Sequence, residues 1–418
     1  MGSKYHNPWL ARFAVGVVLC TLLLVGMGGL VTSKGVGLAV PDWPTSFGYN
    51  MFLLPASQWI GQFGIFEEHS HRLIASVVGL LTAVLASWLW VRETTGQTRT
   101  VALVGIVISL GLMGVRTEPV FYAMAILAAI VAGGSVFKII TQPGALRWWG
   151  LLAYSMVIVQ GVLGGLRVTQ LKDQIGIFHG TLAQVFLLVL ATLALFNSRW
   201  WKQTPDAEKE SERAPRVIRT HFFYASILIF LQLVLGATMR HQHAGLPVWD
   251  FPAAHGQVWP KTSDAHIAGY NANRLSLQKQ LHAQGHAQDS NGHPAVYLHT
   301  GKNITAKHIH LHMSHRVLAV LILLIVIGAA VVTHRRLGAG HALSKLSLCW
   351  AGLILLQATL GALTVLKYKP ADIATLHVLC GALALLTGVM GTIISRCKYL
   401  PTKHTESIPL MDVKEATS

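Results

Sequence analysis

Four histidines at the starts of apolar stretches are the residues of this sequence best suited to chemistry. His71, His179, His315 and His377 each begin a run of apolar residues. A neutral imidazole is a common ligand of transition metals, and two imidazoles on different helices of one bundle can bind an iron from opposite sides. Four histidines at four helix starts therefore predict two bis-histidine sites, each able to hold an iron porphyrin.

The neighbours of His71 and His315 distinguish the two sites. Glu68 lies three positions before His71, so on a helix the carboxylate and the imidazole share one face. Glu67 would point about 100° away around the helix. His312 stands at the corresponding position before His315. A carboxylate at a membrane edge is costly unless it is used or paired, so we expect chemistry at the first site and electron transfer at the second.

Arg72 and Arg316 directly follow two of these histidines. They could bind porphyrin propionates by charge-assisted hydrogen bonds, or they could only anchor the helix ends at the membrane interface. No Cys-x-x-Cys-His motif occurs, so a porphyrin would not be attached covalently through that motif.

Two plainer interpretations stand beside the porphyrin sites. A single histidine in a membrane helix often only makes a hydrogen bond within the bundle, but four in matching positions favour ligation. Further histidines could hold copper or zinc, although only some of them share a helix face: His69, His308, His310 and His312.

The composition is that of an integral membrane protein, because 52% of the 418 residues are hydrophobic and only 12% are charged. An apolar helix of roughly 20 residues spans a bilayer. We predict an all-α fold with ten spans, of which the third is short, near residues 12–33, 70–92, 101–116, 120–140, 148–168, 176–197, 217–239, 314–334, 343–366 and 374–395.

The distribution of basic residues predicts the orientation of the chain. The net charge is +16, and no basic soluble domain is present, which argues against a nucleic-acid partner. Lysine and arginine gather instead at alternate span ends, as the positive-inside rule describes. We therefore expect a multi-pass protein of the cell membrane, with both termini cytoplasmic and the four histidines near the external face.

The second half of the sequence resembles the first half, which predicts two tandem units of four helices, 1–205 and 206–418. Matching segments recur in the same order, namely 37–44 with 245–252 and 160–166 with 357–363. The number of residues between matching positions differs between the units, so each unit contains an insertion. The first has a hairpin near 97–143, and the second has a long polar external loop near 240–307. This loop gains its extra length near 261–302, a stretch rich in histidine: His266, His282, His286, His293 and His299.

These residues resemble the heme A synthase family over nearly the whole chain, apart from the hairpin and the loop excursion. The most specific segments are Gly37 to Pro44, Glu68-x-x-His71-Arg72 and Gln160 to Leu166, together with the late histidines. The resemblance implies two pseudo-symmetric four-helix bundles that oxidise the C8 methyl group of heme O to the formyl group of heme A by successive hydroxylations.

The resemblance also implies roles for single residues. His71 and His179 would bind the substrate heme, and Glu68 would be the essential carboxylate. His315 and His377 would bind a resident heme b. Membrane lipid surrounds such a protein, and heme O synthase and a terminal oxidase are candidate partners.

One departure from the family concerns reducing equivalents. Many bacterial members carry a cysteine pair in the first external loop, whereas Thr45-Ser46-Phe47 and the residues after it contain none. The electron partner is therefore unknown. The main alternative function is a diheme b-type membrane cytochrome that passes electrons without chemistry on heme, for which Glu68 would be incidental.

Overall fold

The computed structural model describes residues 6–115, 117–242, 244, 246–284 and 303–398. Within these residues, nine helices are long and apolar enough to cross a membrane. The only sheet in the described ranges is a pair of two-residue strands, β1 (Thr45–Ser46) and β2 (Tyr49–Asn50), which run antiparallel. The prediction of an all-α, multi-pass membrane protein is thus confirmed.

The first group of helices forms a closed ring of four. It consists of α1 (Pro8–Lys34), α2 (Ile65–Glu93), α5 (Leu146–Gln170) and α6 (Asp173–Asn197). Helix α1 packs on α2, α2 on α5, α5 on α6, and α6 returns to α1. Because each helix has two neighbours, α2 and α6 lie on opposite corners of the ring, around a core that includes Leu10, Leu85 and Leu190.

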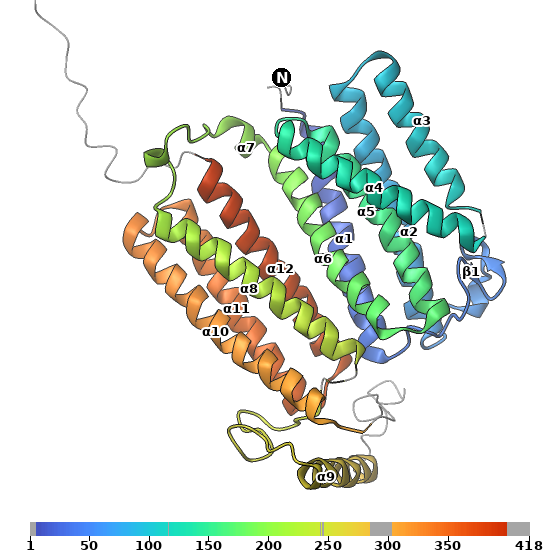
Figure 1. Ribbon diagram of the computed structural model, residues 1–418, viewed down its shortest axis with the longest axis vertical. Helices are drawn as coiled ribbons and strands as arrows, with labels where there is room; N and C mark the ends of the chain where they lie inside the picture. The colour runs from blue at the N-terminus through green and yellow to red at the C-terminus, as the bar shows by residue number, and fades with distance from the viewer. Residues whose placement is uncertain (1–5, 116, 243, 245, 285–302, 399–418) are drawn as a thin grey trace, which may run out of the picture.

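The second group repeats this arrangement with α8 (Arg216–His241), α10 (Ala306–Leu337), α11 (Ala342–Leu366) and α12 (Ala371–Cys397). The packing order is α8, α10, α11, α12 and back to α8, so α10 and α12 occupy opposite corners. Phe222 and Trp350 stack in its core with ring centroids 5.1 Å apart. The two groups meet where α12 packs on α1 and α8 packs on α6 (Figure 1).

Two further helices lie outside the first group, at its edge (Figure 1). Helix α4 (Glu118–Thr141) packs on α5, and α3 (Gly96–Leu112) packs on α2. The expected span 101–116 lies over α3, which ends earlier, at Leu112, and whose 17 residues make it shorter than the nine helices counted above. The chain turns at Met113 and Gly114, whose N–H groups bond back to the last turn.

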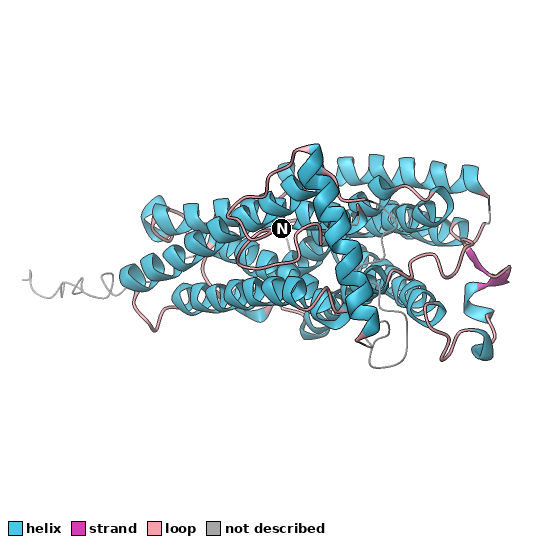
Figure 2. Ribbon diagram, turned by 90° about the horizontal axis from the view of Figure 1, so that it is seen from below, coloured by secondary structure: helices cyan, strands magenta, loops and turns pink. Residues whose placement is uncertain are grey.

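The polar loop between α8 and α10 contains a helix that we did not predict. Helix α9 (Asp264–Ala283) lies across the ends of the bundle helices when the molecule is seen from below (Figure 2). The side-chain amide of Asn271 accepts the N–H of Ile304 at 2.8 Å and donates to the carbonyl of Ile304 at 3.1 Å. These two hydrogen bonds fix the helix to the start of α10. The histidines at 286, 293 and 299 lie outside the described residues.

Short elements and caps fix the helix ends. The short elements are α7 (Arg199–Gln203), η1 (Met51–Leu53), η2 (Ala56–Gln58) and η3 (Glu210–Glu212). Asn7 accepts hydrogen bonds from two N–H groups at the start of α1, and Thr305 accepts one from His308 at the start of α10. Such caps satisfy amides that have no partner within a helix.

Both ends of the described chain lie at one end of the bundles. His6 contacts the backbone of Asn197, and Lys398 forms an ion pair with Asp206 at 2.7 Å. The loop with β1 and the helix α9 lie at the opposite end (Figure 1). The side of the membrane that each end faces remains a prediction from the distribution of lysine and arginine.

Candidate functional site

The four predicted histidines lie near the starts of α2, α6, α10 and α12, at the end of the bundles that carries β1 and α9. Each imidazole packs its Cε1 edge against a glycine of the preceding core helix. A Cβ atom placed on Gly28 would lie 3.1 Å from Cε1 of His71, and one on Gly361 would lie 3.1 Å from Cε1 of His377. The corresponding distance is 3.4 Å for Gly164 with His179 and for Gly236 with His315.

These glycines let all four imidazoles come close to a neighbouring helix, most tightly at Gly28 and Gly361, where an added methyl group would crowd the ring. Sequence reasoning assigned the glycines only to helix packing. The four contacts show that they are also the surfaces on which the imidazoles rest.

The histidines form two pairs across the two rings of helices. His71 on α2 and His179 on α6 stand on opposite corners of the first ring, and we call them the first pair. His315 on α10 and His377 on α12 stand on opposite corners of the second ring and form the second pair. The members of each pair are close enough to interact electrostatically. The structure therefore brings together the residues that the sequence predicted to act together.

The rings retain the polar atoms that a metal ligand requires. In all four histidines, Nδ1 is buried and has no hydrogen-bond partner among the described residues. The side chains are nevertheless partly exposed, so each imidazole also has atoms that the bundle does not enclose. A buried nitrogen without a partner is costly. Two facing imidazoles in an apolar bundle, resting on glycines, fit the axial ligands of a porphyrin iron.

Three glutamines support three of the four histidines. Gln160 donates to the backbone carbonyl of His179 at 3.0 Å, and Gln232 donates to that of His315 at 2.9 Å. The amide nitrogen of Gln357 lies 3.4 Å from Nε2 of His377. Each glutamine lies four residues before a glycine that supports a ring, so both face the same histidine.

The first helix breaks this pattern, because Leu24 stands four residues before Gly28. His71 therefore has no such glutamine. Sequence reasoning used two of the glutamines only to align the units and missed Gln232. The spacing Gln-x-x-x-Gly, present three times within the apolar runs, could have found it.

Glu68 is buried, with 4% of its surface exposed, and both oxygens have donors. Oε1 forms an ion pair with Arg72 at 2.7 Å, and Oε2 accepts the N–H of Val40 at 2.9 Å. Arg72 also donates to three loop carbonyls, those of Val40, Asp42 and Thr45. The carboxylate next to the first pair is thus tied to the loop after α1, which we call the first cover loop (residues 36–48).

The second bundle has an equivalent cover loop (residues 246–256), held by Arg316. This guanidinium donates to the carbonyls of Ala253, Val248 and Asp250 at 3.0, 3.4 and 2.7 Å. His312 replaces the carboxylate and lies 3.2 Å from Nε of Arg316. Both arginines that were expected to bind propionates are therefore used by loop carbonyls in this structure, while their role toward a porphyrin remains a prediction.

An aspartate closes each cover loop in the same way. Asp42 accepts the N–H groups of Phe47 and Gly48 at 2.7 and 2.8 Å, and Asp250 accepts those of His255 and Gly256 at the same distances. Burial alone would raise the pKa of these carboxyls, but the backbone hydrogen bonds lower the pKa of both below the usual value. The aspartates were aligned in the sequence without a role, and the structure makes them loop anchors.

The outer hairpin supports the first cover loop. Trp43 lies against Gly165, where a Cβ atom would collide with the indole. Its ring centroid is 4.4 Å from that of Phe121 on α4. Gln170 on α5 also donates to the hydroxyl of Tyr122 at 3.0 Å. The hairpin thus packs on the wall that holds this loop in place.

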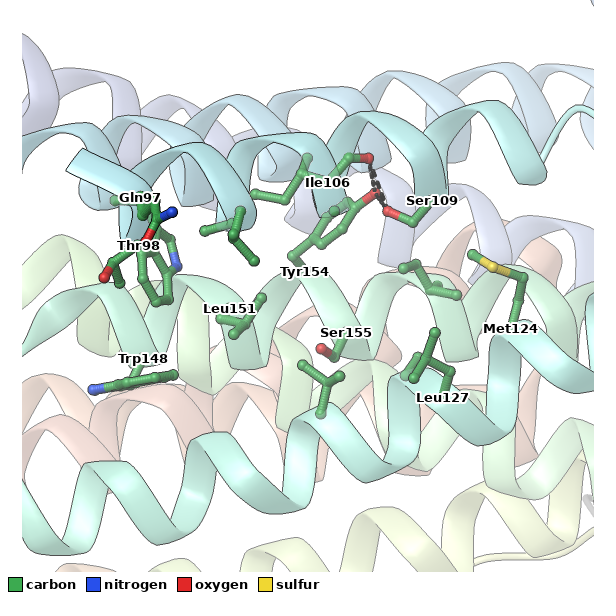
Figure 3. Close-up of a pocket in the computed structure, with 17 residues that line it drawn as sticks. Gln97, Thr98, Ile106, Ser109, Met124, Leu127, Trp148, Leu151, Tyr154 and Ser155 are labelled. Carbon is green, nitrogen blue, oxygen red and sulfur yellow. Dashed lines mark hydrogen bonds between the residues drawn. The ribbon is translucent and has the colours of Figure 1, made fainter. Parts of the chain in front are cut away.

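A cavity of about 770 Å³ lies between the hairpin and the bundle, and none of the four histidines lines it (Figure 3). Its wall is mostly apolar, and the hydroxyl groups of Tyr154 and Ser109 bond to each other there at 2.6 Å. It offers no pair of imidazoles and no carboxylate, so we do not place chemistry there.

The alternative metal site finds no geometric support in the described ranges. No group of three or more histidine, cysteine, aspartate or glutamate side chains there could hold a metal ion. His69 is buried and lies 3.3 Å from Ser46, and its ring packs on Trp59. His312 faces Arg316 instead of another imidazole.

Comparison with known proteins agrees with this geometry. A family model described as COX15-CtaA, cytochrome oxidase assembly protein, matches residues 119–389. The chain is 27% identical over 259 residues to the heme A synthase of Shouchella clausii, an alignment that covers 60% of this chain and 65% of that protein.

Two further relatives carry the same name. For the heme A synthase of an Exiguobacterium species, identity is 22% over 254 residues, covering 60% of this chain and 64% of the relative. For that of Brucella anthropi, it is 31% over 144 residues, covering 29% and 40%. The chain thus spans less than two thirds of the length of each of these relatives.

Proposed function

Because the chain belongs to the COX15-CtaA family of cytochrome oxidase assembly proteins, we propose that it is a heme A synthase. Its reaction would oxidise the C8 methyl group of heme O to the formyl group of heme A through successive hydroxylations. The observation that carries this proposal is the repeated geometry of the histidines. In each bundle two imidazoles stand on opposite helices within electrostatic range of each other, and each imidazole rests on a glycine. Only the first pair has a buried carboxylate one turn away.

The two pairs would divide the work. The first pair, in the unit 1–205, would bind the substrate heme next to Glu68. The second pair, in the unit 206–418, would hold heme b, which supplies one-electron transfer when bound. His312 in place of the carboxylate supports this division, because the position one turn before the second pair then carries no carboxylate, whereas the first pair has the buried Glu68.

The glutamines also support the division. A resident cofactor needs ligands that are firmly held, and both members of the second pair have a glutamine beside them. A substrate must enter and leave, and His71 has only Leu24 at that position. Groups around a metal ligand that fix its orientation commonly strengthen binding.

Glu68 would act from the edge of the first site. Its carboxylate could accept a proton from the hydroxylated methyl group, or it could stabilise positive charge that develops there. In both roles the ion pair with Arg72 and the N–H of Val40 orient it and exclude water. Because Val40 belongs to the first cover loop and Arg72 is bonded to three of its carbonyls, opening of that loop would loosen the hold on the carboxylate at the moment the site is accessible.

A pair of matched variants tests this assignment. Glu67 is also buried and paired, with Lys34 at 2.7 Å and the N–H of Gly64 at 2.7 Å, but it lies on another side of α2. Glu68→Gln should retain bound heme and lose formyl product by roughly 100-fold or more, as expected for loss of an acid–base group. Glu67→Gln should retain product formation within a few fold.

The readout is chromatographic separation of the extracted hemes. The wild type should yield heme A or its alcohol intermediate together with heme B. Heme B alone from wild-type protein supplied with heme O would favour the diheme cytochrome. Equal product from the wild type and Glu68→Gln would remove Glu68 from the reaction.

The location and the partners of the protein follow from the same proposal. The protein would act in the cell membrane with both termini in the cytoplasm, and the histidine pairs would lie near the external face. Heme O synthase would supply its substrate, and a terminal oxidase would receive its product. Its electron-transfer partner would have to act without a cysteine pair in the first cover loop.

A further inference from the structure

Three cations lie between the two histidine pairs without a carboxylate bonded to them. They are Arg167 near the end of α5, Arg240 near the end of α8, and Lys369 between α11 and α12. Electrostatic interactions connect Arg167 with Arg240 and Arg240 with Lys369. Like charges at such positions repel each other, and charged groups at membrane depth are costly unless they are paired. Among the described residues no carboxylate is bonded to any of the three side chains, so the cluster is open to a further anion.

Arg167 belongs to the surroundings of the first pair. It follows Gly164, on which the His179 ring rests, by three residues, so both lie on one face of α5. Its guanidinium passes beneath the first cover loop, where a Cβ atom on Gly37 would lie only 2.8 Å from Nη2. No hydrogen bond joins this guanidinium to another described residue. Glu68 and Asp173 are in electrostatic range, but neither is bonded to this guanidinium, and both oxygens of Glu68 are bonded to other donors.

Arg240 occupies the corresponding place in the second bundle. It follows Gly236, which supports the His315 ring, by four residues on α8. It reaches into the other bundle, where Nη2 donates to the carbonyl of Gly29 at 2.7 Å and to Oγ of Ser33 at 2.9 Å. Nη1 lies 3.5 Å from the carbonyl of Ala374. These acceptors are all neutral, so they orient the guanidinium without balancing its charge.

Lys369 adds a third charge beside Arg240. Burial, and then the neighbouring guanidinium, lower the pKa of its ammonium to about 8. Its backbone is held in a left-handed conformation, with φ of 64°, and its N–H bonds to the carbonyl of Thr364. The side chain makes no hydrogen bond to another described residue. Lys172 stands at the matching place after α5, but it is exposed.

We propose that Arg167, Arg240 and Lys369 form a shared seat for the carboxylate groups of the porphyrins, between the two histidine pairs. This inference rests on the proposed function, because it requires that the pairs bind heme. A planar guanidinium suits a carboxylate well, and each arginine lies one turn beyond a glycine that supports an imidazole. Arg72 and Arg316, the arginines expected to do this from the sequence, are already bonded to the cover loops.

The test compares two porphyrins that differ only in their carboxylates. Full-length protein, produced under heme limitation and purified in detergent, is titrated with iron protoporphyrin IX and with its dimethyl ester. Wild-type protein should bind the free acid more tightly. Arg167→Gln and Lys369→Gln should weaken binding of the free acid by roughly tenfold or more, as for other charge-assisted hydrogen bonds, and leave binding of the ester within about twofold.

A second readout is the reduction potential of the bound heme, which loss of a nearby positive charge should make more negative. Lys172→Gln is the control and should change neither the affinity nor the potential. Lys369→Gln removes no side-chain hydrogen bond within the described residues, so this variant still tests the proposal if an arginine variant fails to fold.

The outcomes separate the two proposals. If the variants weaken the acid and the ester equally, or weaken neither, heme binding stands and the seat is wrong. If wild-type protein binds neither porphyrin, the proposed function fails and the seat fails with it. A loss confined to the free acid, with the potential shifted, supports the seat.

Discussion

The glycines under the imidazoles allow a prediction with an internal comparison. At Gly28 and Gly361 the space beside the imidazole is tight, because an added methyl group would lie 3.1 Å from the ring carbon Cε1. At Gly164 and Gly236 that distance is 3.4 Å. Alanine at a tight position would push the ring back by about 0.3 Å, the difference between the two distances. Overpacking of this kind costs about 1 to 3 kcal/mol, or roughly 5- to 150-fold in affinity.

Each tight glycine reports on a different pair. Gly28→Ala should lower heme affinity at the first pair, and Gly361→Ala should lower it at the second. At Gly164 and Gly236 the methyl group makes an ordinary contact, and alanine favours a helix by up to about 1 kcal/mol over glycine. Those two variants should stay within about threefold of wild type in heme affinity.

The assay is heme content by pyridine hemochrome, together with absorbance titration of protein made under heme limitation. Thermal unfolding of the heme-free protein controls for a general loss of stability. If alanine at all four glycines lowers affinity alike, or if the looser positions are the more sensitive, the rings do not rest on these glycines as described.

Three smaller predictions concern the supports around the site. Asp42→Asn should destabilise the protein by about 1 kcal/mol at pH 7. The lowered pKa of this carboxyl means that its contribution is present above the ordinary value of 3.8 and is lost as the pH falls through the lower, folded value, so the difference in unfolding temperature should shrink and vanish as the pH is lowered past that point. Gln232→Leu should fold, since Leu24 fills that place in α1, yet lower heme affinity at the second pair a few fold, measured by titration. Arg72→Gln removes three bonds to the first cover loop, so limited proteolysis there should become faster while cleavage in the second cover loop is unchanged.

Features that depend on local pattern could be predicted from the sequence. The all-α membrane fold follows from long apolar runs, and the positions of the four histidines follow from where those runs begin. The short helix α3 was recognised as weak, but its end at Leu112 depends on turn contacts around Gly114 that hydropathy does not register.

Features that depend on contacts between distant segments could not be predicted in the same way. Helix α9 has too polar a composition to stand out, and its docking on Ile304 is a tertiary contact. The choice between Arg72 and Arg167 as carboxylate ligands is another case. Adjacency to His71 favoured the first, whereas only the fold reveals that loop carbonyls bind Arg72 and that no described residue bonds to the guanidinium of Arg167.

Heme stoichiometry in single-histidine variants tests the central claim most directly. Purified wild-type protein should carry two low-spin hemes per chain when supplied with both hemes. His179→Ala should lose the low-spin signal of one heme and retain the other, and His377→Ala should do the reverse. Loss of both signals from one substitution, or of neither, would contradict the assignment of the two pairs to two separate hemes.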